Sequence, residues 1–173
     1  ALTGHGYDYL VSLERVELTG GAGDNRLDAA AYTAGLVTLN GAAGDDTLVG
    51  GFFDDVLDGG DGFDRVEQIV NADQELTNSL LTGRGTDAVL SMESAMLTGG
   101  AADNLLKASS VTLGPVTLKG AGGDDTLIGG PGDDLIDGGA GDDLVRQSTN
   151  ADQVLANSLL TGLGTDNLTR IER

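Results

Sequence analysis

The sequence has 173 residues, a formal net charge of −19 and no cysteine. This charge excludes polyanionic partners such as nucleic acids and favours cations, while the lack of cysteine excludes disulfides and thiolate metal sites. Aromatic residues make up only 3% of the chain and glycine supplies 29 residues, so we expect a thin, repetitive core of Leu, Val and Ile rather than an ordinary globular interior.

The chain contains a long internal repeat. The segment NADQELTNSLLTGRGTDAVLSMES, which begins at Asn71, returns at Asn150 with most of its residues identical and no gap. We therefore expect one continuous solenoid made of a first copy (1–79), a second copy (80–158) and the beginning of a third (159–173). Because the third copy stops in mid-repeat, we interpret both ends as boundaries inside a longer array.

Each copy contains three tandem units of nine residues. Residues 41–67 divide into GAAGDDTLV, GGFFDDVLD and GGDGFDRVE, and residues 120–146 into GAGGDDTLI, GGPGDDLID and GGAGDDLVR. The sixth place is always aspartate: Asp46, Asp55, Asp64, Asp125, Asp134 and Asp143. The eighth place is always apolar: Leu48, Leu57, Val66, Leu127, Ile136 and Val145.

Each unit predicts a glycine turn followed by a very short strand. Glycines at the first, second and fourth places permit positive φ and close backbone approach, and only the middle residue of the strand needs to face inward. Two units make one coil of eighteen residues with a strand on either side. We therefore expect an all-β fold, a right-handed parallel β-helix or β-roll solenoid, in which Asp46 stacks on Asp64 and Asp125 on Asp143, with Asp55 and Asp134 on the opposite edges.

The remaining part of each copy lacks the glycine frame. Segments such as VTLNG (37–41) and VTLKG (116–120) still predict strands that run into turns. We expect residues 9–40 and 65–86, with their equivalents in the second copy, to continue the solenoid as longer coils with few metal ligands. If NADQELTNSLL forms one long strand with a bulge, each copy has eight turns and four coils, and the two copies stack in register.

The aspartates predict bound calcium. Of the 28 acidic residues, 22 are Asp, which favours turns and short-armed coordination over helical surfaces. Stacked carboxylates repel one another unless cations lie between them. Carboxylates and backbone carbonyls form an all-oxygen environment that suits several Ca²⁺ ions, whereas Mg²⁺ demands a tighter octahedron and keeps its water.

Units such as GGPGDDLID and GGAGDDLVR resemble the glycine-rich nonapeptides of the RTX (repeats-in-toxin) proteins, a calcium-binding β-helix repeat. The resemblance implies that calcium is held by the six sixth-place aspartates and by backbone carbonyls. It extends to carbonyls at Gly41, Ala43, Gly60, Gly62, Gly120, Gly122, Gly139 and Gly141. Phe53 replaces the fourth-place glycine in GGFFDDVLD, which puts the geometry of that turn in question.

Weaker copies of the frame leave two interpretations open. An aspartate in an incomplete frame is either a solvated turn residue or a further calcium ligand, and this applies to Asp8, Asp73, Asp87, Asp152 and Asp166. We expect Asn25 and Asn104 to form turns in the left-handed conformation. The aspartates at the fifth place are expected to face water and to attract cations at long range.

Catalysis finds little support in the sequence, and we do not expect an enzyme. One histidine and no cysteine cannot assemble a site that recurs in each copy, and no GK[ST] follows a glycine run. Paired aspartates alone do not indicate a glycosidase, which needs a spaced acid and base in a cleft.

Three functions fit the sequence. The first is a calcium-dependent structural module of a larger secreted bacterial protein, with calcium and flanking domains or further repeats as partners; the resemblance implies type I secretion of an unfolded chain that folds outside the cell. The second is an adhesin stalk or another surface-binding solenoid. The third is an accessory repeat region of an extracellular hydrolase. No long apolar run of the length that spans a bilayer occurs, so we expect no membrane insertion by this segment.

Overall fold

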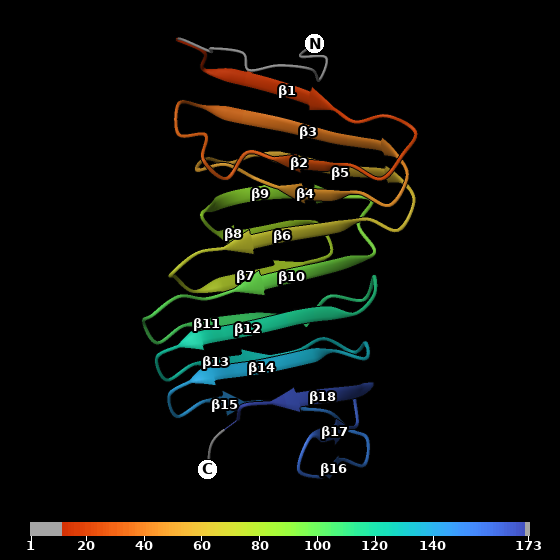
Figure 1. The fold of residues 1–173 in the computed structure, drawn as a ribbon. Coiled ribbons are helices and arrows are strands. Elements are labelled where there is room, and N and C mark those ends of the chain that lie inside the picture. Colours follow the sequence, from red (N-terminus) through yellow and green to blue (C-terminus); the bar gives the residue numbers. More distant parts are fainter. Residues whose placement is uncertain (1–11, 172–173) are drawn as a thin grey trace.

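A computed structural model describes residues 12–171, and within that range the chain forms eighteen strands and no helix. Asp8, one of the candidate ligands, lies outside the described residues. The strands build two sheets of nine that face each other along the whole stack, with β1 at one end and β15 and β16 near the other (Figure 1). The predicted all-β solenoid is confirmed, and its fold is a β-roll. Residues 12–171 therefore contain no helix that could cross a membrane.

The first sheet has the order β1-β3-β5-β9-β8-β7-β11-β13-β15. Its strands are β1 (Arg15–Thr19), β3 (Leu36–Ala43), β5 (Val56–Asp61), β7 (Gln74–Thr77), β8 (Leu80–Gly83), β9 (Gly85–Leu90), β11 (Leu105–Ser110), β13 (Thr126–Ile128) and β15 (Leu144–Val145).

The second sheet has the order β2-β4-β6-β10-β12-β14-β18-β17-β16. Its strands are β2 (Arg26–Asp28), β4 (Thr47–Val49), β6 (Arg65–Ile69), β10 (Ser94–Thr98), β12 (Val116–Gly122), β14 (Leu135–Ala140), β16 (Val154–Leu155), β17 (Leu159–Thr161) and β18 (Thr165–Thr169).

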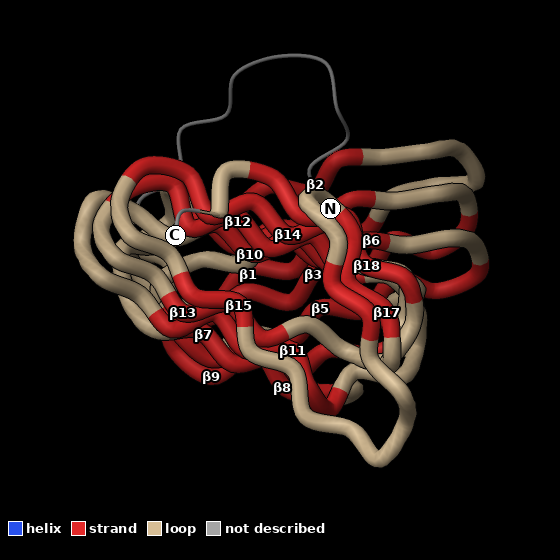
Figure 2. The backbone as a smooth tube through the Cα atoms, turned by 90° about the horizontal axis from the view of Figure 1, so that it is seen from below, coloured by secondary structure: helices blue, strands red, loops and turns tan. Residues whose placement is uncertain are grey.

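Most neighbouring strands are parallel and are joined by crossing to the other sheet. Leu39 of β3 lies opposite Leu57 of β5, and Leu48 of β4 lies opposite Val66 of β6. Both pairs are eighteen residues apart, so the tandem units form the coils of eighteen residues that the nine-residue period predicts. Seen along the stack, the strands overlie one another in the middle and the turns gather at the edges (Figure 2).

The core is a single layer of apolar side chains between the sheets. The middle residues of the unit strands fill it, and Leu48, Leu57 and Leu127 are completely buried. Their flanking residues face outward, as the alternation along a strand requires. Because the layer is narrow, each nine-residue unit buries little more than one large side chain.

The segment NADQELTNSLL is not one long strand with a bulge; that expectation is wrong. The chain reverses after β7, and β7, β8 and β9 form an antiparallel meander within the first sheet. After β6 the chain enters the first sheet at β7, and β8 and β9 then fill the two places between β7 and β5. As a result β9 pairs with β5, and β7 pairs with β11. The sequence misleads here because two antiparallel strands show the same alternation as one longer strand.

The two copies do not stack in register either. Equivalent strands of the two copies lie in opposite sheets: β3 belongs to the first sheet and its equivalent β12 to the second, and the meander β7-β8-β9 of the first sheet returns as β16-β17-β18 in the second. Each copy therefore adds an odd number of half-turns of the solenoid, where one half-turn is one passage of the chain from one sheet to the other. The turns of the second copy consequently lie on the opposite edge from those of the first.

Candidate metal centre in the stacked turns

Four of the glycine turns share one backbone conformation, and we call them the open turns. They end at the sixth-place residues Asp46, Asp64, Asp125 and Asp143. Their second-place residues all have positive φ, at Ala42 (80°), Gly60 (98°), Ala121 (79°) and Gly139 (107°). Their fourth-place residues do too, at Gly44 (110°), Gly62 (150°), Gly123 (97°) and Gly141 (133°). These are left-handed conformations that favour glycine, yet alanine adopts them twice at the second place.

The sixth-place aspartates of the open turns stack in two columns. The backbone N–H of Asp46 donates to Oδ1 of Asp64 over 2.8 Å, and the N–H of Asp125 donates to Oδ1 of Asp143 over 2.9 Å. Each column begins at an asparagine, because the N–H of Asn25 donates to Asp46 and that of Asn104 donates to Asp125. The predicted pairing of aspartates eighteen residues apart is therefore confirmed as a structural contact.

The second carboxylate oxygen of each open-turn aspartate has no donor. Oδ2 of Asp46, Asp64, Asp125 and Asp143 is buried and has no hydrogen-bond partner among the described residues. A buried charged oxygen without a partner costs several kcal/mol, of the order of the desolvation of a charge, so an uncompensated row of them is unstable.

Backbone carbonyls face the same oxygens. A Cβ on Gly41 would collide with both Oδ2 of Asp46 and the carbonyl oxygen of Gly59, and a Cβ on Gly120 would collide with Oδ2 of Asp125 and the carbonyl oxygen of Gly138. The carboxylate of one turn and a carbonyl of the next coil thus crowd the bare Cα of the first-place glycine. A carboxylate oxygen without a donor beside a carbonyl oxygen forms a cradle for a cation.

The donor set suits a hard cation. Nowhere in residues 12–171 do three or more acidic or histidine side chains converge, so a cation in an open turn would take most of its ligands from the backbone. Oxygen-only sites with one or two carboxylates and several carbonyls fit Ca²⁺, which accepts six to eight oxygens in flexible geometry. Asp46, Asp64, Asp125 and Asp143 are the side chains that would hold it.

The eight backbone positions that the resemblance implies as carbonyl ligands all lie in the open turns. They are Gly41, Ala43, Gly60, Gly62, Gly120, Gly122, Gly139 and Gly141. The turns lie directly on one another, since Ala42 is paired with Gly60 and Ala121 with Gly139 in the sheet register. Calcium ligation by these carbonyls stays a prediction.

Four other turns have a different conformation, and we call them the closed turns. In each, the second-place N–H donates to the sixth-place side chain of the same turn: Gly21 to Asn25, Gly51 to Asp55, Gly100 to Asn104 and Gly130 to Asp134, over 2.6–2.8 Å. No residue of these turns has positive φ. The expectation that Asn25 and Asn104 adopt the left-handed conformation is therefore wrong; they shape the turn through their side-chain oxygens instead.

Both carboxylate oxygens of Asp55 and Asp134 are occupied. Besides the bond within the turn, Asp55 accepts from the N–H of Val37 and Asp134 from that of Val116. A carboxylate satisfied on both oxygens needs no cation. The geometry thus favours cation binding at the open turns, while ligation by Asp55 and Asp134 stays a prediction without this support.

The weaker candidates occupy three kinds of place. Asp87 and Asp166 are buried at the meanders, where they accept from the N–H groups of Asp55 and Asp134. Asp73 is exposed and accepts from the N–H of Leu105, and Asp152 is exposed. The structure therefore brings none of these four carboxylates into an open turn.

Several buried carboxylates have raised pKa values. Burial, the largest cause, raises the pKa of Asp87 to about 7 and that of Asp166 to about 6, and the neighbouring carboxylates of Asp55 and Asp134 add to the effect. Burial also raises the pKa of Asp64 and Asp125 above the usual range for Asp, with further contributions from stacked acidic groups. The field at these positions therefore disfavours negative charge unless positive charge is supplied.

The fifth-place aspartates are exposed, as expected, but they also join coils. The N–H of Phe63 donates to Asp45, and the N–H of Asp142 donates to Asp124, both over 2.9 Å. These bonds run from the later coil to the earlier one, opposite to those of the sixth-place aspartates. The pairs Asp45–Asp46 and Asp124–Asp125 thus fasten their turns to both neighbouring coils.

Sequence reasoning missed three residues that contribute to the columns. The carboxylate of Glu93 accepts from the N–H of Asp64 and so continues the first column. Ser91, with φ of 50°, places its carbonyl against Gly59, and Arg170, with φ of 47°, does the same against Gly138. Ser91 and Arg170 occupy equivalent positions in the long repeat, which was the available signal, but neither stands in a glycine frame.

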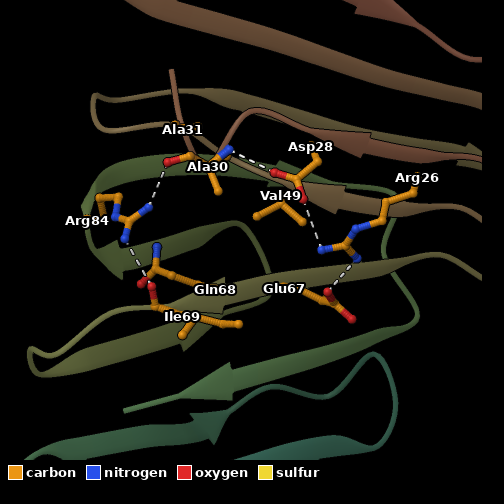
Figure 3. A pocket seen from close by; sticks show the side chains of 11 residues that line it. Arg26, Asp28, Ala30, Ala31, Val49, Glu67, Gln68, Ile69 and Arg84 are labelled. Carbon is orange, nitrogen blue, oxygen red and sulfur yellow. Dashed lines mark hydrogen bonds and ion pairs between the residues drawn. The ribbon is translucent and has the colours of Figure 1, made fainter. Parts of the chain in front are cut away.

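A pocket of about 360 Å³ lies outside the columns, against strands β2, β4 and β6 (Figure 3). Arg84, at the tip of the meander, donates to the carbonyls of Ala30 and Ile69 and covers the ring of Phe52 at 4.4 Å. Arg26 is paired with the buried Glu67. The arginines are thus engaged in holding the meander and the sheet together.

A comparison with protein-family models matches residues 17–31, 35–67 and 117–145 to four copies of the RTX calcium-binding nonapeptide repeat. The chain carries RTX repeats. The matched residues include all four open turns, and the chain is therefore a calcium-binding repeat module. A comparison with curated proteins gave no match.

Removing one carboxylate from an open turn should remove calcium. We expect Asp143→Asn to weaken calcium binding in the column of Asp125 and Asp143 about tenfold or more. The reason is that Oδ2, which has no donor, is replaced by an amide N–H₂ group. Asp142→Asn is the matched control, since it removes the same charge from the neighbouring exposed position. Isothermal titration with Ca²⁺ measures both; equal losses in the two variants would contradict the assignment of Oδ2.

A methyl group at the first place of an open turn should be harmful. Gly120→Ala places a Cβ on Oδ2 of Asp125 and on the Gly138 carbonyl, and we expect a loss of about 1–3 kcal/mol of unfolding free energy, as for other overpacked sites. Gly23→Ala, with no atom within 4 Å of the added Cβ, should change stability by less than about 0.5 kcal/mol. Denaturant unfolding in saturating calcium measures the free energy of unfolding of both variants. A Gly120→Ala variant as stable as Gly23→Ala would contradict the close approach of the two oxygens to Gly120.

Without calcium, acid should favour the folded chain. The pKa of Asp in the unfolded chain is about 3.9, so a raised pKa means that the folded chain binds protons more tightly than the unfolded chain. Protonation of Asp87 and Asp166 therefore stabilises the fold, and this stabilisation is lost as the pH rises through about 6 and 7. Circular dichroism in chelator should show more β structure at about pH 5 than at about pH 8.

The variant Asp87→Asn is the control for this pH dependence, since it removes the group with the highest of these pKa values. Its dependence on pH should be smaller than that of the original chain. A β signal in chelator that falls on acidification would be the opposite of the expected sign.

Proposed function

We propose that the chain is a structural module of a larger secreted protein, unfolded where calcium is scarce and folded by calcium outside the cell. The observation that carries the proposal is the set of four buried carboxylate oxygens without donors, each beside a backbone carbonyl. A fold that places such groups together needs the cation, so the free energy of binding becomes free energy of folding.

Composition supports the same proposal. A net charge of −19 opposes compaction, and the chain has neither disulfides nor a broad core to resist that repulsion. Extracellular calcium near the millimolar range suits weak sites built largely from carbonyls, whereas cytosolic calcium would leave them empty. The unfolded form would then be the one that is exported.

An adhesive or ligand-binding surface receives less support. A flat repetitive ligand calls for the same outward side chain on every coil, but the aligned positions along the first sheet change from Thr38 to Val56 to Ala88. The RTX repeat that the chain carries is a structural calcium-binding unit rather than a catalytic one. We propose no enzymatic activity for this segment.

The test is to titrate the chelated protein with calcium while recording circular dichroism and the hydrodynamic radius. We expect an expanded chain with little β structure in chelator and a cooperative change to a compact β form as calcium is added. Magnesium at the same concentrations is the control and should act weakly. A compact β form that persists after complete chelation would overturn the proposal.

A further inference from the structure

The open turn that ends at Asp64 is stacked on a segment that is not a nonapeptide. On this edge the next passage from the first sheet to the second is made by Ser91, Met92 and Glu93, between β9 and β10. We call these three residues the SME turn. It contains no glycine, and it lies outside the ranges that match the RTX repeat, one of which ends at residue 67 and the next of which begins at 117.

The SME turn makes the same backbone contacts to the turn of Asp64 as one open turn makes to another. The N–H of Asp46 donates to Oδ1 of Asp64 over 2.8 Å, and the N–H of Asp64 donates to Oε2 of Glu93 over 2.8 Å. In both cases the following residue donates back: Arg65 to the carbonyl of Asp46 and Ser94 to that of Asp64, each over 2.9 Å. Glu93 therefore occupies the position of a sixth-place aspartate.

The carbonyl of Ser91 takes the place of a first-place glycine carbonyl. A Cβ on Gly41 would lie 2.2 Å from Oδ2 of Asp46 and 2.3 Å from the carbonyl oxygen of Gly59. A Cβ on Gly59 would lie 2.5 Å from Oδ2 of Asp64 and 2.1 Å from the carbonyl oxygen of Ser91. The oxygens of Asp46 and Asp64 that have no donor thus lie in two separate cradles, and the SME turn provides one side of the second.

The second cradle contains negative charge that nothing in the described chain compensates. Asp64 is completely buried, and its Oδ2 has no hydrogen-bond partner among residues 12–171. Glu93 is half-buried and takes part in none of the ion pairs of the described residues, and the nearby Arg65 is paired with Glu67. A buried carboxylate oxygen without a partner, beside a carbonyl and a second carboxylate, calls for a cation.

The backbone part of this arrangement recurs in the second copy. Ser91 has a φ of 50°, and Arg170, which lies 79 residues later, has a φ of 47°. Left-handed conformations are uncommon for residues other than glycine. Arg170 directs its carbonyl toward Gly138, where a Cβ would lie 2.3 Å from that oxygen and 2.4 Å from Oδ2 of Asp143. The side chain differs between the copies, but the position of the carbonyl oxygen is the same.

We propose that Oδ2 of Asp64, the carbonyl of Ser91 and the carboxylate of Glu93 hold a calcium ion of their own, distinct from the ion held at Asp46. This inference rests on the proposed function, because it requires that the open turns bind calcium. Two carboxylates with backbone carbonyls form the hard oxygen environment that suits Ca²⁺. The ion would fasten β10 to its neighbour β6, and so hold the coil that follows the meander against the nonapeptide coils (Figure 1).

Counting the bound calcium by equilibrium dialysis of the full chain tests the proposal. Glu93→Gln keeps an oxygen that accepts from the N–H of Asp64 but removes the charge. At the lowest calcium concentration that saturates the original chain, it should bind one ion fewer. Glu17→Gln is the matched control, since it removes the same charge from an exposed position of β1, and it should bind as many ions as the original chain. A folded Glu93→Gln variant with the full number of ions would overturn the proposal.

The double variant Asp46→Asn, Glu93→Gln distinguishes two ions from one shared ion. Asp46→Asn alone removes the oxygen of the first cradle and should also bind one ion fewer than the original chain. If each cradle holds its own ion, the double variant should bind two ions fewer. A double variant that loses no more calcium than either single variant would mean that the two cradles share one ion, which would overturn the proposal.

Hydrogen exchange provides a measurement that does not depend on the folding of Glu93→Gln. In the Asp46→Asn variant the second cradle is intact, so calcium should still slow the exchange of residues 91–98 as it does in the original chain. Loss of this protection in Asp46→Asn would contradict a separate ion.

Circular dichroism of the same samples separates this inference from the proposed function. An original chain that calcium does not fold overturns the proposed function. A chain that calcium folds, and whose folded Glu93→Gln variant keeps every ion, overturns the site at the SME turn alone.

Discussion

The structure depends on a buried carboxylate oxygen that has no donor and lies beside a backbone carbonyl. This arrangement occurs at all four open turns, where Oδ2 of the sixth-place aspartate and a carbonyl of the neighbouring coil both lie close to the first-place glycine. Coulomb repulsion between such acceptors grows as water is removed, so the arrangement is unfavourable without a cation and favourable with one. The surrounding fold has little with which to oppose it, because the core is one layer of side chains thick. Folding and cation binding therefore concern the same atoms.

The odd number of half-turns in each copy distributes this interaction around the solenoid. The column that contains Asp46 and Asp64 lies where the chain passes from the first sheet to the second, and the column of Asp125 and Asp143 lies where it passes back. The meander sets the offset, since β7, β8 and β9 all add to one sheet before the chain crosses. A long array built in this way alternates its charged columns between opposite edges. This keeps the negative columns of successive copies apart.

The sequence was sufficient for the features that follow from period alone. The nine-residue frame predicted the two sheets, the inward residues such as Leu57 and the stacking of aspartates eighteen residues apart. It failed where the frame is missing: NADQELTNSLL forms two antiparallel strands, and nothing in its alternation marks the reversal. It also missed Glu93, which takes an aspartate's place in a column although it lies outside any glycine turn. Both cases depend on which coil lies next in space, which a local pattern does not specify.

The difference between open and closed turns follows from that spatial neighbourhood as well. Glycine content does not decide it: GGPGDD is closed although it has three glycines, and GAAGDD is open with alanine at the left-handed position. Three tandem units alternate between the edges, so the first and third share an edge and the middle one has no nonapeptide turn eighteen residues away on its own edge. Asp46 and Asp64 are such a first and third unit, and Asp55 is the unit between them. The middle carboxylate, Asp55, is stacked on Asp87 of the meander rather than on another nonapeptide turn, and its second oxygen accepts from its own Gly51 N–H. The open turns thus occur as a stacked first and third unit, and a run of three units provides one such pair rather than three equivalent sites.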